Sequence, residues 1–232
     1  MEISAKSLIF DYGATIDTNG IHWGEVILKA YENADIPVSR EEFREAYVHV
    51  ERMLGNQPII RPKHTFRDVL KIKFKLQFEK LGLTNTAQAE HISEQCYENT
   101  KQTINRAKET LDVLSKHYPM ALVSNFYGNL RTVLNEFGLT KYFRLIIESA
   151  ETGLRKPDPA IYRLCLEKLG LSPKETIIIG DSYKNDINPA ITIGCPSIWL
   201  KGKGWDDKDD AIVHPYIIRD FSELKNLPLG EI

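Results

Sequence analysis

Two carboxylates each follow a short apolar run, and the two runs lie far apart in the sequence. Asp11 comes directly after residues 7–10, and Asp181 comes directly after residues 176–180. A carboxylate at the end of a buried strand can act as a nucleophile that forms an aspartyl-phosphate. Carboxylate oxygens are also ligands that Mg²⁺ prefers. The pattern therefore predicts an anionic site with a nucleophile and a divalent metal.

Four further polar residues are candidates for the same site. Ser124 and Asn125 end another apolar run, where their side chains and the following backbone N–H groups suit phosphate oxygens. Lys156 precedes a Pro-Asp-Pro segment, which is typical of a fixed loop that begins a helix. There the lysine would offset the charge of an anionic nucleophile that meets an anionic phosphoryl group. Asp186, about one helical turn beyond Asp181, is expected to support the metal site.

The elements that must position these residues alternate between strand and helix from about residue 106 onward. Strands are expected over residues 120–124, 145–148, 176–180, 197–200 and, late and short, 216–219. Helices are expected over residues 107–117, 130–137, 160–169 and 186–193, with a last turn capped by Ser222. This alternation implies right-handed βαβ units in a doubly wound parallel α/β sheet, which binds ligands at the carboxyl ends of its strands.

The segment between the first strand and residue 106 has a different character. It is highly charged and has the periodicity of helices, with breaks at Pro37, Pro58 and Gly82 and no clear strand. Ser39 and Glu42 have the spacing of a capping box. We therefore expect a helical cap domain over residues 19–105, inserted into an α/β core domain made of residues 1–18 and 106–232.

Composition narrows the classes of partner and the location. The chain has 232 residues and a formal net charge of −2, which gives no sign of a nucleic acid or an anionic membrane as partner. No apolar run approaches the roughly 18 residues that span a bilayer, and the N-terminus does not resemble a signal peptide. The three cysteines are far apart and are expected to be reduced and buried. These features predict a cytoplasmic protein.

The four polar motifs together resemble those of the haloacid dehalogenase-like (HAD) hydrolase superfamily. The first motif of that family, Asp-x-Asp-x-Thr, corresponds to residues 11–15, and the second corresponds to Ser124. The third corresponds to Lys156, and the fourth, Gly-Asp-x-x-x-x-Asp, to Asp181 and Asp186. The helical insert resembles the C1 cap of the family. The resemblance covers nearly the whole chain.

This resemblance implies an enzyme that hydrolyses a phosphorylated small molecule through an aspartyl-phosphate intermediate. Asp11 would be the nucleophile, and Lys156 would assist catalysis and bind the phosphoryl group together with the serine and asparagine of the second motif. Mg²⁺ would be held by Asp11, the carbonyl of Gly13 and Asp181, and Asp186 would complete the metal site. The protein would act as a monomer or homodimer.

Gly13 is the main departure from the pattern, because phosphatases of the family carry their general acid and base there. General acid–base catalysis is typically worth about 10²–10⁴-fold, so turnover is expected to be impaired or specialised. Ala14 replaces the usual glycine of the turn. Asp17 is expected to face the hinge of the cap and not to replace the missing acid.

Three alternatives remain open. In the first, the chain is a degenerate member that binds a phosphorylated ligand or a partner without turnover, because the proton donor is missing at Gly13. In the second, it resembles the phosphonoacetaldehyde hydrolases of the family, which carry a small residue at this position and use a cap lysine as a Schiff base, with Lys63 as the candidate. In the third, it resembles the L-2-haloacid dehalogenases, which use no metal.

The cap contributes several residues with weaker signals. Arg61, His64 and Arg67 would form either a basic patch for substrate or a solvated loop, and Lys63 beside them is otherwise solvated surface. No residue of this loop points to one ligand. His22 and Trp23 either face the substrate or pack in the hinge. Residues 70, 74 and 78 are expected to form a packed helix stripe, and residues 206–210 an exposed acidic turn.

Overall fold

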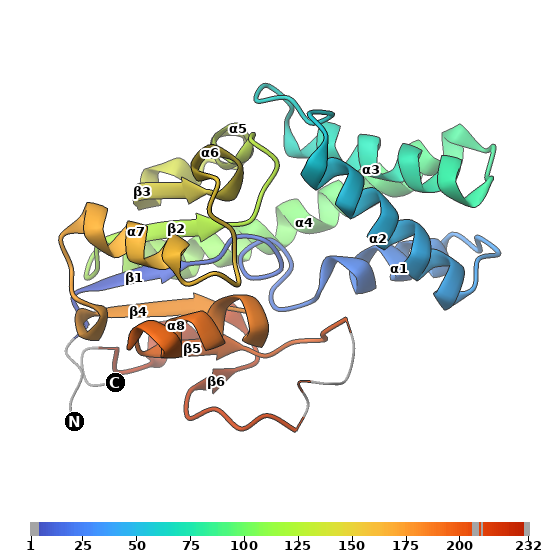
Figure 1. Ribbon diagram of the computed structural model, residues 1–232. Helices are drawn as coiled ribbons and strands as arrows, with labels where there is room; N and C mark the ends of the chain where they lie inside the picture. Colours follow the sequence, from blue (N-terminus) through green and yellow to red (C-terminus); the bar gives the residue numbers. More distant parts are fainter. Residues whose placement is uncertain (1–4, 206–208, 210, 230–232) are drawn as a thin grey trace.

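A computed structural model describes residues 5–205, 209 and 211–229, and it has the expected α/β architecture (Figure 1). The strands are β1 (Ser7–Phe10), β2 (Met120–Ser124), β3 (Phe143–Glu148), β4 (Thr176–Gly180), β5 (Ser197–Leu200) and β6 (Ile217–Ile218). They form one parallel sheet in the order β3-β2-β1-β4-β5-β6. This confirms the predicted fold class, with β1 near the centre of the sheet.

The central strands are buried on both faces, as their continuous apolar sequences predict. Successive side chains of a strand point to opposite faces. In β1, Leu8 and Phe10 join one hydrophobic cluster, which includes residues of α5 (Leu130–Glu136), whereas Ile9 joins the cluster of α7 (Ala160–Leu169). The sheet is therefore covered by helices on both faces, with α7 and α8 (Asn188–Ile193) on the same one (Figure 1).

A group of helices is inserted between β1 and β2 and extends beyond the carboxyl ends of the strands (Figure 1). It consists of α1 (Trp23–Asn33), α2 (Arg40–Asn56), α3 (Phe66–Leu81) and α4 (Thr86–Leu114). The stripe formed by Leu70, Phe74 and Phe78 is buried in this group, which confirms its predicted packing role. Tyr31 and Phe43 complete an aromatic centre with it.

Helix α4 corrects one sequence prediction. A separate helix was expected over residues 107–117, but residues 86–114 form one continuous helix. No glycine or proline lies between its ends, so nothing in the sequence interrupts it. Its C-terminal half packs on the sheet and its N-terminal half belongs to the inserted helices. The proposed boundary between cap and core at residue 105 falls inside this helix.

Smaller differences concern the ends of elements. Residues 183–187 form a π-helical turn, and α8 begins only at Asn188. Asp220, and not Ser222, caps the last helical turn, Phe221–Asn226. The capping box of Ser39 and Glu42 is confirmed. Strand β3 begins at Phe143, two residues earlier than expected.

Other expectations concern the cysteines, the acidic turn and the membrane. The three cysteines are buried and form no disulfide with one another. The acidic turn expected over residues 206–210 falls almost wholly outside the described residues. Within the described ranges, no helix has both the length and the apolar character needed to cross a bilayer.

Candidate active site

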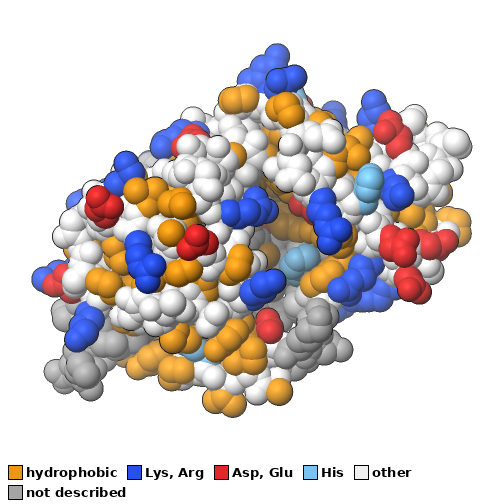
Figure 2. Space-filling view, viewed as in Figure 1, with side chains coloured by type: hydrophobic (Ala, Val, Ile, Leu, Met, Phe, Trp, Pro, Cys, Tyr) orange, Lys and Arg blue, Asp and Glu red, His pale blue; other side chains and the backbone are white. Residues whose placement is uncertain are grey.

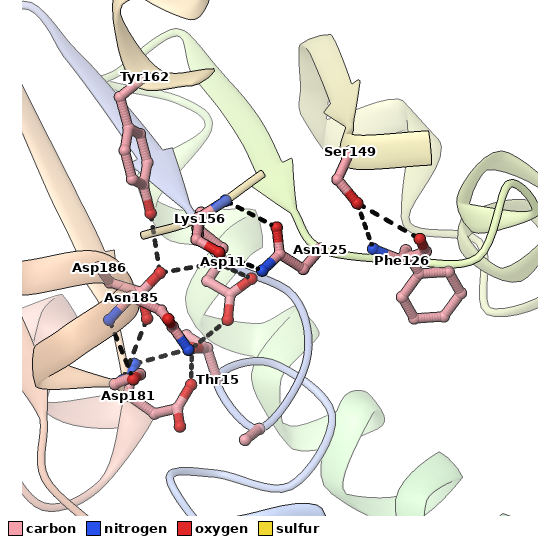
Figure 3. A network of polar contacts seen from close by, with 12 residues as sticks. Asp11, Thr15, Asn125, Phe126, Ser149, Lys156, Tyr162, Asp181, Asn185 and Asp186 are labelled. Carbon is pink, nitrogen blue, oxygen red and sulfur yellow. Dashed lines mark hydrogen bonds and ion pairs between the residues drawn. The ribbon is translucent and has the colours of Figure 1, made fainter. Parts of the chain in front are cut away.

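Three carboxylates from separate segments meet at the carboxyl edge of the sheet (Figure 3). Asp11 follows β1, Asp181 follows β4, and Asp186 lies in the π-helical turn. Each contributes a carboxylate oxygen to a group whose members all lie within 4.8 Å of one another. Asp11 and Asp186 are buried, and Asp181 is partly buried. The structure thus brings Asp186 together with Asp11 and Asp181, the two aspartates that the sequence placed at this sheet edge.

Lys156 is the cation of this cluster. Its Nζ lies 2.7 Å from Oδ1 of Asp11 and 2.7 Å from Oδ1 of Asp186, and the side chain is buried. Burial lowers the pKa of Lys156, but the charges of Asp11 and Asp186 outweigh this effect and leave the pKa raised. The lysine therefore carries its proton when it faces the two carboxylates.

Asn125 fixes the backbone of the lysine. Its Nδ2 donates to the carbonyl oxygen of Lys156 at 2.9 Å, and its Oδ1 accepts from the N–H of Lys156 at 2.9 Å. Because both ends of this amide are engaged, the side chain of Asn125 positions the lysine segment. Ser124 ends β2 with 1% exposure and also lines the cavity. Both residues line the cavity beside Asp11, and phosphate binding by them stays a prediction.

Two hydroxyl groups complete the cluster, and sequence reasoning gave neither of them a role. Thr15 Oγ1 donates to Oδ1 of Asp181 at 2.9 Å and accepts from the backbone N–H of Asp181 at 3.0 Å. The hydroxyl of Tyr162 on α7 donates to Oδ1 of Asp186 at 2.8 Å. Thr15 was recognisable as the last residue of the first motif. Tyr162 gave no signal, because only the packing of α7 on the sheet brings it to Asp186.

The donor set of this cluster fits Mg²⁺. Burial raises the pKa of Asp11 to about 6, against the opposing effect of Lys156. Burial, followed by the charges of Asp186 and Asp11, raises the pKa of Asp181 well above its usual range. The single lysine does not balance three carboxylates, so a divalent cation would relieve their repulsion. Asp11, Asp181 and Asp186 offer the oxygens that could hold it, and the carbonyl of Gly13 stays a predicted ligand.

The turn after Asp11 is held by the side chain of Asp17. Ala14 has a φ of 63°, a left-handed backbone conformation that residues other than glycine rarely adopt. Its N–H donates to Oδ1 of Asp17 at 2.6 Å, and Nε1 of Trp23 donates to Oδ2 at 2.9 Å. Asp17 thus contacts the hinge residue Trp23, as predicted, but it also lines the cavity that contains Asp11.

The buried carboxyl group of Asp17 predicts how the free energy of unfolding changes with pH. Burial raises the pKa of this carboxyl from its ordinary value near 4 to about 7. The native state therefore binds the proton more tightly than the unfolded state, so Asp17 makes the free energy of unfolding fall as pH rises from about 4 to 7. Its share of this fall is up to about 4 kcal/mol.

The test is urea unfolding of the wild type and Asp17→Asn from pH 4 to pH 8, in the presence of EDTA. The variant should lose less stability over this range than the wild type. Parallel pH profiles for the two proteins would contradict the raised pKa.

The cluster forms one end of a cavity of about 580 Å³ between the sheet edge and the inserted helices. Figure 2 shows it as a hollow near the centre of the view, with hydrophobic side chains inside and Lys or Arg side chains around its mouth. His22 and Trp23 line it and also pack in the hinge, where Trp23 Nε1 donates to Asp17 and the His22 ring accepts from the N–H of Gly24, so both alternatives remain. The cavity also receives Glu51 from α2 and Lys73 from α3.

The basic residues of the cap loop lie outside this cavity, which favours the solvated-loop alternative for them. Arg61 and Lys63 are exposed, and neither they nor His64 is among the described residues that line the cavity. Arg67 Nη1 lies 2.5 Å from Oε1 of Glu94 on α4, so its charge is used within the cap. Sequence reasoning missed Glu51 and Lys73, because the charges of an amphipathic helix normally mark its solvated face.

Comparison with known proteins adds to these observations. The profile of a family described as "Haloacid dehalogenase-like hydrolase" matches residues 9–200. The "Haloacid dehalogenase-like hydrolase domain-containing protein 3" of Mus musculus is 28% identical over 201 residues, which cover 82% of this chain and 78% of that protein. The "Phosphoglycolate phosphatase" of Yersinia pestis is 36% identical over 116 residues, which cover 48% of each chain.

A solved structure shares the fold over nearly the full length. It is the putative HAD-hydrolase YfnB from Bacillus subtilis, bound to magnesium. The two chains align with a TM-score of 0.59 and 21% sequence identity, covering 96% of this chain and 97% of the other. This likeness concerns the fold, with its helices inserted after the first strand.

Proposed function

Because the chain belongs to the haloacid dehalogenase-like hydrolase family, we propose that it is a Mg²⁺-dependent phosphatase of phosphorylated small molecules. It belongs, in this proposal, to the branch with a C1 cap, and its first motif has lost the general acid at Gly13. The observation that carries the proposal is the contact of the Asp11 carboxylate with buried, protonated Lys156 beside Asp181. Relatives named as phosphatases support the same class of substrate.

The reaction would proceed in two displacements. In the first, a carboxylate oxygen of Asp11 attacks phosphorus, the bond from phosphorus to the leaving-group oxygen breaks, and the leaving group departs with the electron pair. In the second, water attacks phosphorus and the bond from phosphorus to the Asp11 oxygen breaks. This step restores the carboxylate, releases inorganic phosphate and passes a proton of the water to solvent or to the departed oxyanion.

The residues around Asp11 would support both steps. Lys156 would offset negative charge as the anionic nucleophile approaches the anionic phosphoryl group. Ser124 and the backbone N–H groups that follow it would bind phosphoryl oxygens. Asp186 would keep Lys156 in place, since its Oδ1 lies 2.7 Å from Nζ. A bound magnesium ion would neutralise the charge shared by the carboxylates and the phosphoryl group.

The same residues argue against the two hydrolase alternatives. Lys63 is exposed, and the lysine that does reach the cavity from α3, Lys73, lies 2.7 Å from Oε1 of Glu51. Burial lowers the pKa of Lys73, but Glu51 outweighs it and leaves the pKa raised, so this amine is protonated and unsuited to forming a Schiff base. The dehalogenase alternative requires no metal, whereas three clustered carboxylates favour one.

Phosphate release tests the proposal and separates it from a binding protein without turnover. The wild type should release phosphate from acetyl phosphate and phenyl phosphate with Mg²⁺, and adding excess EDTA should lower the rate at least about 100-fold. Readdition of Mg²⁺ should restore it. A purified, folded protein that releases no phosphate from either compound would contradict the phosphatase proposal and leave the binding alternative.

A further inference from the structure

The cavity is unusually rich in aromatic side chains. All three tryptophans of the chain, residues 23, 199 and 205, line it. Phe, Tyr and Trp make up seven of its 29 lining residues, about a quarter, whereas they make up 9% of the residues of the whole chain. Three of these rings, those of Trp199, Phe66 and Tyr47, are buried in the wall. The other four, those of residues 23, 126, 127 and 205, keep part of their surface exposed, although large rings gain most free energy when they are fully packed. The rings therefore indicate a ligand with a flat apolar face.

One ring cluster joins the core to the cap beside the hinge. The ring of Trp205 lies 5.0 Å from that of Tyr47 on α2 and 5.1 Å from that of His22, measured between centroids. A Cβ at Gly24 would come within 1.8 Å of the Trp205 ring, so only glycine leaves room for this indole. The Trp205 indole thus packs directly on the backbone of α1, which holds it in the wall of the cavity.

An ion pair between a buried lysine and a partly buried glutamate supplies the polar groups in the cap part of the cavity. Lys73 Nζ lies 2.7 Å from Oε1 of Glu51, and the hydroxyl of Tyr127 donates to Oε2 of Glu51 at 2.5 Å. The side chain of Lys73 is 8% exposed and that of Glu51 is 27% exposed. Charges are costly to bury, and this pair has no net charge. It suits an uncharged polar substituent that both accepts and donates a hydrogen bond, and not a second anion.

The missing acid points to the same kind of leaving group. An alkoxide is a poor leaving group unless a proton reaches it, whereas a phenolate leaves without one. Gly13 has no side chain to supply that proton, and the open space beside it is part of the same cavity. A phosphate attached directly to an aromatic ring would need no proton donor at position 13. Its ring could also pack against the aromatic wall of the cavity.

Resting on the proposed phosphatase function, we propose that the substrate is an aryl phosphate, a phosphomonoester of a phenol-type hydroxyl. Its phosphoryl group meets Asp11 and Lys156, its ring packs against Tyr47 and Trp205, and an uncharged polar substituent reaches the pair of Glu51 and Lys73. The phenolate departs with the electron pair of its bond to phosphorus and takes its proton from solvent.

This proposal is tested with substrates that distinguish the effect of an aromatic ring on the rate from the effect of leaving-group acidity. Phenyl phosphate is compared with a fluoroalkyl phosphate of matched leaving-group acidity, and with benzyl phosphate, which has the ring but leaves as an alkoxide. The kcat/KM for phenyl phosphate should exceed that for either by at least about tenfold, because it alone combines a ring that makes aromatic contacts with a leaving group that needs no proton. Equal values for the acidity-matched pair would overturn the proposal.

Variants connect the preference to the rings. Tyr47→Leu should lower the ratio of kcat/KM for phenyl phosphate over acetyl phosphate about tenfold. The matched control is Tyr216→Leu, because Tyr216 is 38% exposed and is not a lining residue. It should leave the ratio unchanged. A ratio that does not change in Tyr47→Leu would overturn the role of this ring.

Tryptophan fluorescence gives a measurement that does not depend on turnover. Since Trp23 and Trp205 line the cavity and are only partly buried, binding of phenylphosphonate, which has no ester bond to cleave, should change the emission. Its Kd should be at least about tenfold lower than that of butylphosphonate. Equal Kd values would overturn the ring proposal even if phosphate release is normal. Absence of phosphate release from every substrate, acetyl phosphate included, would instead overturn the proposed function.

Discussion

Replacement of Asp11 by Asn is expected to lower kcat for phenyl phosphate by about 10⁴-fold or more, the size of loss that follows removal of a covalent nucleophile. The amide keeps the shape of the side chain but is not nucleophilic. The substitution should not unfold the protein, because burial raises the pKa of Asp11 to about 6 and its charge is therefore unfavourable in the native state.

Asp35→Asn is a matched control for this result. Asp35 is an exposed residue of the cap with a φ of 50°, a left-handed conformation that asparagine also tolerates. It should retain wild-type kcat and thermal stability. The decisive readout is phosphate release by Asp11→Asn at saturating phenyl phosphate and Mg²⁺. A rate within tenfold of the wild type would exclude Asp11 as the nucleophile.

The sheet edge of this site could be predicted from the sequence, for a definite physical reason. A strand buried on both faces is a continuous apolar run, so the polar residue at its end is visible in the sequence, as with Asp11, Ser124 and Asp181. Parallel strands end at one edge, so their terminal residues must lie near one another. Lys156 was visible because the Pro-Asp-Pro segment after it fixes the loop.

The cap side of the cavity could not be predicted in this way. Glu51 and Lys73 lie on amphipathic helices, where charged residues usually mark the solvated face, and only the packing of α2 against α3 shows that they point inward. Trp205 follows β5 by five residues, but its partners Tyr47 and His22 come from the first quarter of the chain. Such contacts depend on how the cap meets the core, which no local pattern encodes.

Gly13→Asp is expected to raise kcat for an alkyl phosphate such as benzyl phosphate by about 10²-fold, at the lower end of the range for general acid–base catalysis. The position can accept the change, since a Cβ at Gly13 would meet no atom within 4 Å and its φ lies outside the left-handed region. The new carboxyl group would protonate the leaving alkoxide and then take a proton from the attacking water. Acetyl phosphate needs no such proton, so its rate should rise much less.

The control for this gain is Gly13→Ala, which adds the Cβ without the carboxyl group. If the gain arises from proton transfer, only the aspartate variant should show it, and its rate should depend on pH through a group that the wild type lacks. If the alanine variant gains as much, the effect comes from restricting the turn that follows Asp11.

An unchanged rate on benzyl phosphate in both variants, with normal phosphate release from acetyl phosphate, would contradict the role assigned to Gly13. The step limited by the missing acid would then not be the one that sets the rate. The substitution thus tests a physical claim about this chain: that its nucleophile and metal site are complete, and that its choice of leaving group follows from the absence of one carboxyl group.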